Sequence, residues 1–401
     1  MDRGIRLGSV AGIEVHMDWS LLVIFLLILV SLGAVSFPAL HPQWSPATSW
    51  LVAFVAAVLF FTSVFLHELS HALVGRAYGI TVRRITLFIF GGLAHMEDEP
   101  RHWRGELFMA GAGPLTSLAL GAGFLVLGVL GAGPEGLDPE RPRESLARLG
   151  PVTTLLFWLG PVNIILGVFN LVPGFPLDGG RMLRAVMWGM TGSLRRATRW
   201  ASRAGQGFAW LLILSGVTMI LGARLPVFGG GPINGLWLAF IGWFLNTAAL
   251  ASYRQILVRE ALHDVPVQRL MQADPVTVSP GMSLRDLAEG PFRESAQRVF
   301  PVVEEGRLVG LVGRPEVRER DPEEREGLRV AEIMVPEERV ARVRLRQDAQ
   351  EAMRELARAG VNQLPVVEDG RLRGLIRRKD LLHWLVVYGD PELAAALERD
   401  T

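Results

Sequence analysis

Residues 51–74 read LVAFVAAVLFFTSVFLHELSHALV, an apolar run whose last turns contain His67, Glu68 and His71. A helix of about 20 apolar residues crosses a bilayer, so this run is long enough to span a membrane. In a helix His67 and His71 are one turn apart on the same face, and both imidazoles can bind one metal ion. Glu68 is then placed to take a proton from the attacking water, as the HExxH pattern requires.

The composition supports a membrane setting. Of the 401 residues, 50% are hydrophobic and only 20% charged, which is too apolar for an ordinary soluble enzyme of this size. The net charge of +1 gives no support to nucleic-acid binding. The chain has no cysteine, so any metal must be held by His, Asp or Glu. Ionisable side chains within an apolar helix are costly and indicate a functional site.

Apolar runs of spanning length recur along the first 257 residues. Two arginines precede the first run, five follow the second and six follow the fourth, whereas the alternate connections have none at 38–48, three diluted by acidic residues at 132–151 and one at 224–233. Positively charged loops stay in the cytoplasm, so we expect both termini there. The region 1–257 is predicted to be a polytopic α-helical domain of the cell membrane, in contact with the lipid bilayer. We expect about six transmembrane helices, at 18–37, 49–74, 107–131, 152–172, 207–224 and 234–257.

The fourth apolar run ends in an unusual way. Residues 169–181 read FNLVPGFPLDGGR, in which Pro173 and Pro176 stop the helix and Asp178 lies in the break. Irregular backbone at membrane depth is tolerated where it is buried in protein or faces a water-filled cavity. The second and fourth runs both point toward the cytoplasm, so Asp178 is expected at the depth of the two histidines. The alternative is a loop whose aspartate only caps a helix.

Two imidazoles and one carboxylate form a plausible metal-ligand set. On Zn²⁺ they would leave a fourth position for water, the open geometry of a catalytic site. The same ligands also suit other divalent ions, so the residues alone leave the metal undecided.

A second domain is predicted at 258–401, where the composition becomes more charged. Residues 300–311, FPVVEEGRLVGL, recur as residues 364–375, LPVVEDGRLRGL. In each copy an apolar strand, a Gly-centred turn and another apolar strand precede a short helix, the pattern of a hairpin within an α/β unit. Two such units are expected to pack together.

The HELSH pentapeptide together with residues 170–180 resembles the site-2 protease group of intramembrane metalloproteases. The internal repeat resembles a tandem pair of cystathionine-β-synthase (CBS) motifs, at about 265–320 and 328–388. The resemblance implies one zinc ion held by His67, His71 and Asp178, with Glu68 as the general base. It implies that Asn170 polarises the scissile carbonyl or stabilises its oxyanion. The alternative for Asn170 is that it satisfies the backbone where the helix breaks.

The resemblance also implies a substrate class. Site-2 proteases hydrolyse transmembrane proteins after a first cut by another protease. Residues 85–96, ITLFIFGGLAHM, are rich in strand formers and contain Gly91 and Gly92. A hairpin there could hold an unwound substrate by β-augmentation.

CBS pairs commonly bind adenine nucleotides, so the resemblance suggests such a partner for the second domain. The positions where relatives carry ribose-gripping residues are Gly313 and Glu316 in the first copy, and Arg377 and Asp380 in the second. Only Asp380 keeps the expected type, which weakens the suggestion. The alternative is a module that forms a homodimer without a ligand.

Two other functions compete with the protease. A CBS-regulated ion channel or transporter could use the intramembrane His and Asp residues as an ion site. It would distribute ionisable residues along several helices, whereas here they concentrate at two motifs, which favours the protease. An inactive relative acting as a membrane scaffold is disfavoured because every proposed catalytic residue is present.

Overall fold

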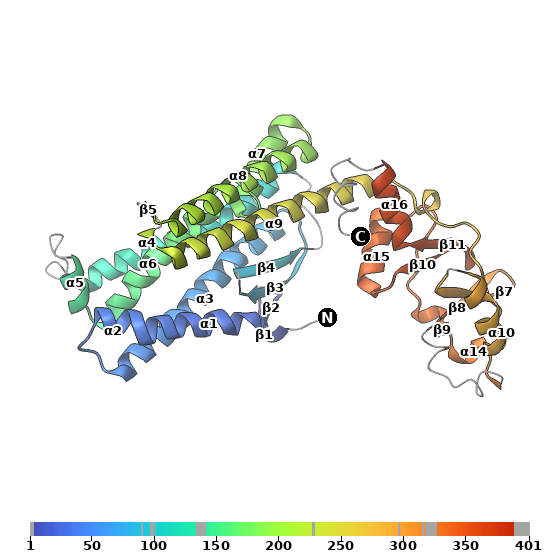
Figure 1. The fold of residues 1–401 in the computed structure, drawn as a ribbon, viewed down its shortest axis with the longest axis horizontal. Coiled ribbons are helices and arrows are strands. Elements are labelled where there is room, and N and C mark those ends of the chain that lie inside the picture. The colour runs from blue at the N-terminus through green and yellow to red at the C-terminus, as the bar shows by residue number, and fades with distance from the viewer. Residues whose placement is uncertain are drawn as a thin grey trace. The chain divides into compact units, whose positions relative to one another are not determined.

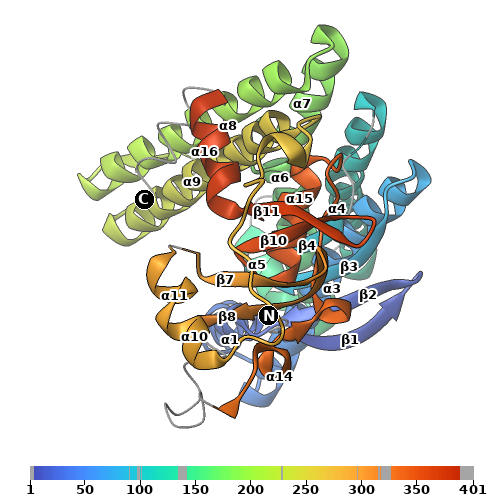
Figure 2. The ribbon, with the colours of Figure 1, turned by 90° about the vertical axis from the view of Figure 1, so that its right-hand side faces the viewer.

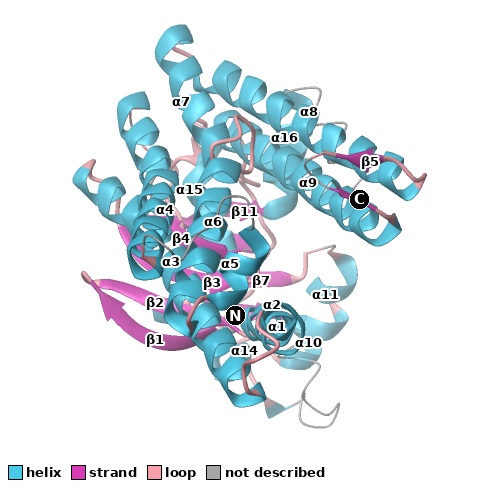
Figure 3. Cartoon of the chain, turned by 90° about the vertical axis from the view of Figure 1, so that its left-hand side faces the viewer, coloured by secondary structure: helices cyan, strands magenta, loops and turns pink. Residues whose placement is uncertain are grey.

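A computed structural model describes residues 4–89, 91–96, 100, 102–133, 142–226, 229–295, 297–314, 317 and 327–388. It divides the chain into two compact units, Met1–Tyr253 and Arg254–Thr401. The first is built mainly of long helices with one small sheet, and the second is an α/β unit (Figures 1 and 3).

Within the described residues of the chain, five helical segments are long and apolar enough to cross a membrane. The predicted span at 207–224 is not among them. It belongs to α8, Leu194–Ile220, whose first half is rich in arginine and whose apolar half alone is shorter than a bilayer requires. The five segments are Ser20–Leu40, which comprises α1 (Ser20–Val30), the π-helical turn η1 (Ser31–Ser36) and α2 (Phe37–Leu40); α3, Pro46–Ala77; α4, Trp103–Ala132; α6, Pro151–Asn170; and Pro232–Arg259 of α9, Pro232–Leu262.

Helix α4 packs against α3 and α6, and also against α7, Asp178–Thr191. Small residues permit this, as is usual between membrane helices. A Cβ on Gly160 of α6 would lie 2.6 Å from the Leu125 side chain of α4, and one on Gly167 would lie 3.0 Å from the Pro114 carbonyl oxygen. Helix α4 therefore has little room to move closer to α6. A short helix, α5 (Pro142–Arg148), precedes α6.

The sheet of the first unit lies beside the end of α3 (Figure 1). Its order is β1-β2-β3-β4, formed by Gly4–Val10, Ile13–Asp18, Val82–Phe88 and Gly91–Met96. Strands β2 and β3 are parallel and the other two pairs are antiparallel. The hairpin predicted at 85–96 is thus present as β3 and β4, and β4 is an edge strand. The Arg76 side chain, at the end of α3, donates to the carbonyl oxygens of Gly12 and Val82 at 3.0 and 2.8 Å, which ties the sheet to that helix.

Helices α7, α8 and α9 complete the first unit, with a short pairing of β5 (Arg224–Leu225) and β6 (Gly229–Gly230). Helices α8 and α9 run side by side (Figure 1) and approach closely at two glycines. A Cβ on Gly216 would lie 2.4 Å from the Gly235 carbonyl oxygen.

The second unit contains the predicted repeat. Hairpins β7–β8 (Val299–Glu304 and Arg307–Gly313) and β10–β11 (Gln363–Glu368 and Arg371–Arg377) have the same register, each with an irregularity between the two valines of the PVV sequence (Figure 2). Gly306 and Gly370 adopt positive φ at equivalent turn positions, which favours glycine there. The strands form one sheet of order β10-β11-β8-β7, with β9 paired to β8. The described helices and strands of the second unit are η2 (Val267–Arg269), α10 (Leu284–Glu289), α11 (Pro291–Glu294), β7 (Val299–Glu304), β8 (Arg307–Gly313), α14 (Val330–Ile333), β9 (Val335–Pro336), η3 (Glu337–Arg339), α15 (Ala349–Ala359), β10 (Gln363–Glu368), β11 (Arg371–Arg377) and α16 (Arg378–Tyr388).

Candidate metal centre

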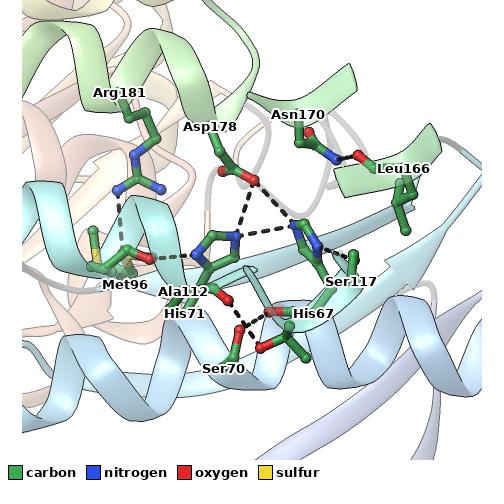
Figure 4. A network of polar contacts seen from close by, with 12 residues as sticks. His67, Ser70, His71, Met96, Ala112, Ser117, Leu166, Asn170, Asp178 and Arg181 are labelled. Atoms are coloured by element: carbon green, nitrogen blue, oxygen red, sulfur yellow. Dashed lines mark hydrogen bonds and ion pairs between the residues drawn. The ribbon is translucent and has the colours of Figure 1, made fainter. Parts of the chain in front are cut away.

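His67 and His71 lie on one face of α3, as their spacing predicts. Their side chains are buried, with 4% and 3% of each residue exposed. The two Nε2 atoms lie 3.2 Å apart (Figure 4). Both imidazoles therefore point to one small volume inside the protein.

Asp178 reaches the same volume from the first residue of α7. Its Oδ2 atom lies 3.1 Å from Nε2 of each histidine (Figure 4). The preceding loop folds tightly, because a Cβ on Gly179 would lie 2.3 Å from the Leu171 carbonyl oxygen. The structure thus brings together the three residues predicted to hold a metal, from helices far apart in sequence.

Helix α4 orients both histidines through their other ring nitrogen. Nδ1 of His71 lies 2.6 Å from the Met109 carbonyl oxygen, and Nδ1 of His67 lies 2.9 Å from Oγ of Ser117. A carbonyl can only accept, so Nδ1 of His71 carries a proton and donates it. In the neutral ring Nε2 then presents a lone pair toward Asp178. Such partners fix the tautomer and orientation of metal-ligating histidines.

The three donors fit a zinc ion. Two nitrogens and a carboxylate oxygen would repel one another at these distances unless a cation or protons lay between them. Ligands at about 2.0 Å from a tetrahedral Zn²⁺ are about 3.3 Å apart, close to the separations in the structure. The space also depends on Gly113 of α4, where a Cβ would lie 2.2 Å from Nε2 of His71 and 2.6 Å from Nε2 of His67.

Glu68 lies beside the edge strand of the sheet. A Cβ on Gly92 of β4 would overlap the Glu68 side chain, so the strand's backbone passes directly against it. Arg181, one turn after Asp178, extends toward β4, and its guanidinium lies 4.0 Å from the sulfur of Met96 (Figure 4). The Glu68 side chain on α3 therefore lies against β4, whose outer edge pairs with no strand among the described residues.

Asn170 is the last residue of α6 and is half-buried. Its Nδ2 donates to the Leu166 carbonyl oxygen at 3.0 Å, one turn back in the same helix (Figure 4). In this structure Asn170 thus satisfies the backbone where α6 ends. The role of Asn170 at the scissile carbonyl stays a prediction.

The contribution of α4 has no recognisable pattern in the sequence. Met109, Gly113 and Ser117 recur every four residues on one face, but a backbone carbonyl, a glycine and a serine have no distinctive chemical pattern in a sequence. The same is true of Gly205 of α8, where a Cβ would lie 2.1 Å from the Phe175 carbonyl oxygen in the Asp178 loop.

The family model for peptidase family M50 matches residues 55–137 and 132–213, and that for the CBS domain matches residues 267–322 and 330–387. Over 97% of its length the chain is 32% identical to Rip3 of Mycobacterium tuberculosis, named as a zinc metalloprotease, of which 94% is covered. The chain belongs to peptidase family M50.

The chain is also similar to other proteins of known sequence or structure. This M50 peptidase is 31% identical to a Synechocystis protein named as a zinc metalloprotease, with 96% of both chains covered. It is 28% identical to a zinc metalloprotease of Methanocaldococcus jannaschii, over 95% of this chain and 96% of that one. The solved site-2 protease from M. jannaschii covers 62% of this chain and 95% of its own, at 26% identity and a TM-score of 0.39. Membership of family M50, the CBS matches and the five membrane-length helices make this protein a multi-pass membrane metalloprotease with tandem CBS domains.

Proposed function

We propose that this M50 peptidase is an intramembrane zinc protease that hydrolyses transmembrane proteins already cut once by another protease. The convergence of His67, His71 and Asp178 inside a bundle of membrane-length helices carries the proposal. A channel or transporter with an ion site would not need a glutamate next to a ligand histidine and beside a free strand edge.

Each residue has a chemical task in this proposal. His67, His71 and Asp178 would hold one Zn²⁺, which when bound activates water and polarises the scissile carbonyl. Glu68 accepts the proton of the attacking water and delivers it to the departing amine. Asn170 turns its amide from Leu166 toward the substrate carbonyl, where one donor contributes a few kcal/mol to transition-state stability.

The free edge of β4 is proposed to hold the substrate. A helical substrate resists hydrolysis because its amides are already bonded, so it must be unwound at the site of cleavage. An extended segment that pairs with β4 would run past Gly92 and so past Glu68.

Proline substitutions test this role. Leu93→Pro removes a backbone N–H from β4 and should abolish cleavage while zinc binding persists. Leu7→Pro, in the opposite edge strand β1, is the matched control and should leave cleavage intact. Cleavage at the wild-type rate by Leu93→Pro would overturn the substrate-strand hypothesis.

The proposed function itself is tested by comparing the wild type with Glu68→Gln in detergent. A panel of single-span membrane proteins is the substrate, and bound metal is quantified in both chains. The proposal expects cleavage by the wild type only, with one zinc in each chain. Absence of bound zinc from the wild type, even after zinc is supplied, would contradict it.

Orientation is a separate proposal, with both termini and the CBS pair in the cytoplasm. The chain has no cysteine, so single cysteines can be introduced and labelled. Ser9→Cys, in β1, should react only with a reagent that enters the cytoplasm. Ala47→Cys, an exposed position at the start of α3, should react with an impermeant reagent added outside. The reverse pattern would overturn the proposed orientation.

We propose a regulatory role for the CBS pair, through an adenine nucleotide or through homodimer formation. In the second repeat the Arg377 guanidinium donates to both carboxylate oxygens of Asp380, at 2.8 and 2.7 Å. A ribose would have to displace this contact, which favours the homodimer. The equivalent Glu316 of the first repeat lies outside the described residues. The molar mass of the full chain in detergent, with and without ATP, tests both routes.

A further inference from the structure

One face of α4 contacts both histidines of the metal centre. Along it lie Glu106, Met109, Gly113 and Ser117, spaced three or four residues apart. The last three contact His71, border the space for the ion and contact His67. Glu106 is the remaining member of this face, and it contacts neither histidine.

Glu106 instead binds Arg184 of α7. Nε of Arg184 donates to Oε1 of Glu106 at 2.6 Å, and a second guanidinium nitrogen contacts the same oxygen. The side chains are 8% and 1% exposed, so both charges are withdrawn from solvent. The pair therefore joins the helix that orients the histidines to the helix that begins with Asp178.

Arg184 also contacts the loop that leads into Asp178. Its guanidinium lies over the Phe175 ring, 5.2 Å from the centroid, a cation–π arrangement. Phe175 is buried and its backbone N–H donates to the Ala201 carbonyl oxygen of α8 at 3.2 Å. One planar side chain thus fixes α4, α7 and the Asp178 loop relative to one another.

A buried ion pair contributes little to the free energy of unfolding, so stability alone does not explain its presence here. Desolvation of two charges offsets most of their attraction, and an apolar pair of similar volume is often as stable. A buried ion pair can instead specify one arrangement of the groups around it. Here the groups around it are α4, which contacts the two histidines, and α7, which begins with Asp178.

We propose that Arg184 and Glu106 are positioning residues that hold Asp178 in place to bind the metal. This inference rests on the proposed zinc site. It adds the ion pair that connects α7, which carries the ligand Asp178, to α4, which orients the two histidines.

The test is a set of variants of the full chain in detergent. Glu106→Met with Arg184→Met removes both charges and keeps the volume, so the metal-free protein should unfold near the wild-type temperature. Its zinc affinity, measured by competition with a chelator, should fall about tenfold or more, as for other residues that support metal ligands. The value of kcat should fall together with the zinc affinity, and the value of KM should change less than kcat.

Arg184→Lys is the second variant, because it keeps the charge but loses the planar stack on Phe175. It should fold and bind zinc more weakly than the wild type. Gly189→Ala is the matched control, since its Cβ would lie 2.9 Å from the Trp103 ring and disturbs α4–α7 packing far from Asp178. It should lower thermal stability and leave zinc affinity unchanged.

Wild-type zinc affinity in the folded double variant and in Arg184→Lys would overturn the inference. Should the double variant fail to fold, Arg184→Lys decides alone. A wild-type chain that binds no zinc would overturn the proposed function, and this inference with it.

Discussion

Gly113→Ala should separate metal binding from folding. The added methyl carbon would lie 2.2 and 2.6 Å from the two Nε2 atoms, about 1 Å inside ordinary contact distance. Helix α4 cannot move away from the histidines toward α6, because the two helices are already in close contact at Gly160 and Gly167. Any shift of α4 would also move the Ser117 and Met109 contacts that orient the histidines.

The expected magnitude follows from this geometry. Loss of one orienting contact weakens metal binding about 10- to 100-fold, and the methyl disturbs two ligands at once. We expect zinc affinity to fall by at least about 100-fold, which is about 2.7 kcal/mol. The metal-free protein should lose at most about 2 kcal/mol of stability, because overpacking a buried site costs about 1–3 kcal/mol and the helix preference of alanine over glycine offsets about 1 kcal/mol.

The assay is chelator competition for zinc, with thermal unfolding of the metal-free chain measured in parallel. Gly123→Ala is the matched control, since it lies on the same helix and its Cβ would meet nothing within 4 Å. It should match the wild type in zinc affinity. Wild-type zinc affinity in Gly113→Ala would refute the assignment of this space to the ion.

Three further predictions concern single residues. Ser117→Ala removes the Nδ1 partner of His67, so zinc affinity should fall about tenfold while KM for substrate is unchanged; an unaltered affinity would refute the orienting role. Arg377→Thr removes the guanidinium that binds Asp380, so ATP should bind the full chain more tightly, as measured by calorimetry. An unchanged ATP affinity would exclude Arg377 as the residue that prevents nucleotide binding. Burial lowers the pKa of His41, although its contact with the Ala147 carbonyl opposes the shift. The unfolded chain then binds a proton more readily than the folded chain, so stability should decline as pH falls below about 6.5, and His41→Gln should remove this part of the slope in thermal unfolding. An unchanged slope would contradict this assignment.

The sequence predicted the features that depend on local spacing. Two histidines one turn apart must share a helix face, and a Pro- and Gly-rich break with an aspartate needs a buried or hydrated setting. The two copies of the PVV hairpin predicted a repeated unit, and the structure has the same strand register in both.

The remaining features depend on contacts between distant segments. The parallel pairing of β2 with β3 joins residues 13–18 to residues 82–88 and has no local pattern. The fifth predicted span, 207–224, was counted from apolarity alone, and in the structure it continues an arginine-rich helix. The face of α4 that orients the histidines consists of Met109, Gly113 and Ser117, which are common residue types. Their contribution to the metal centre depends on the packing of α3 and α7 against α4.

The most direct test of the central claim is to map the bond that the zinc-loaded protein cuts. A single-span substrate is incubated with the wild type and with Asp178→Ala, and the products are identified by mass spectrometry. We expect the wild type alone to cut the substrate, within the apolar segment or at its cytoplasmic border. Cleavage confined to a soluble loop, or the same cut by Asp178→Ala, would contradict it.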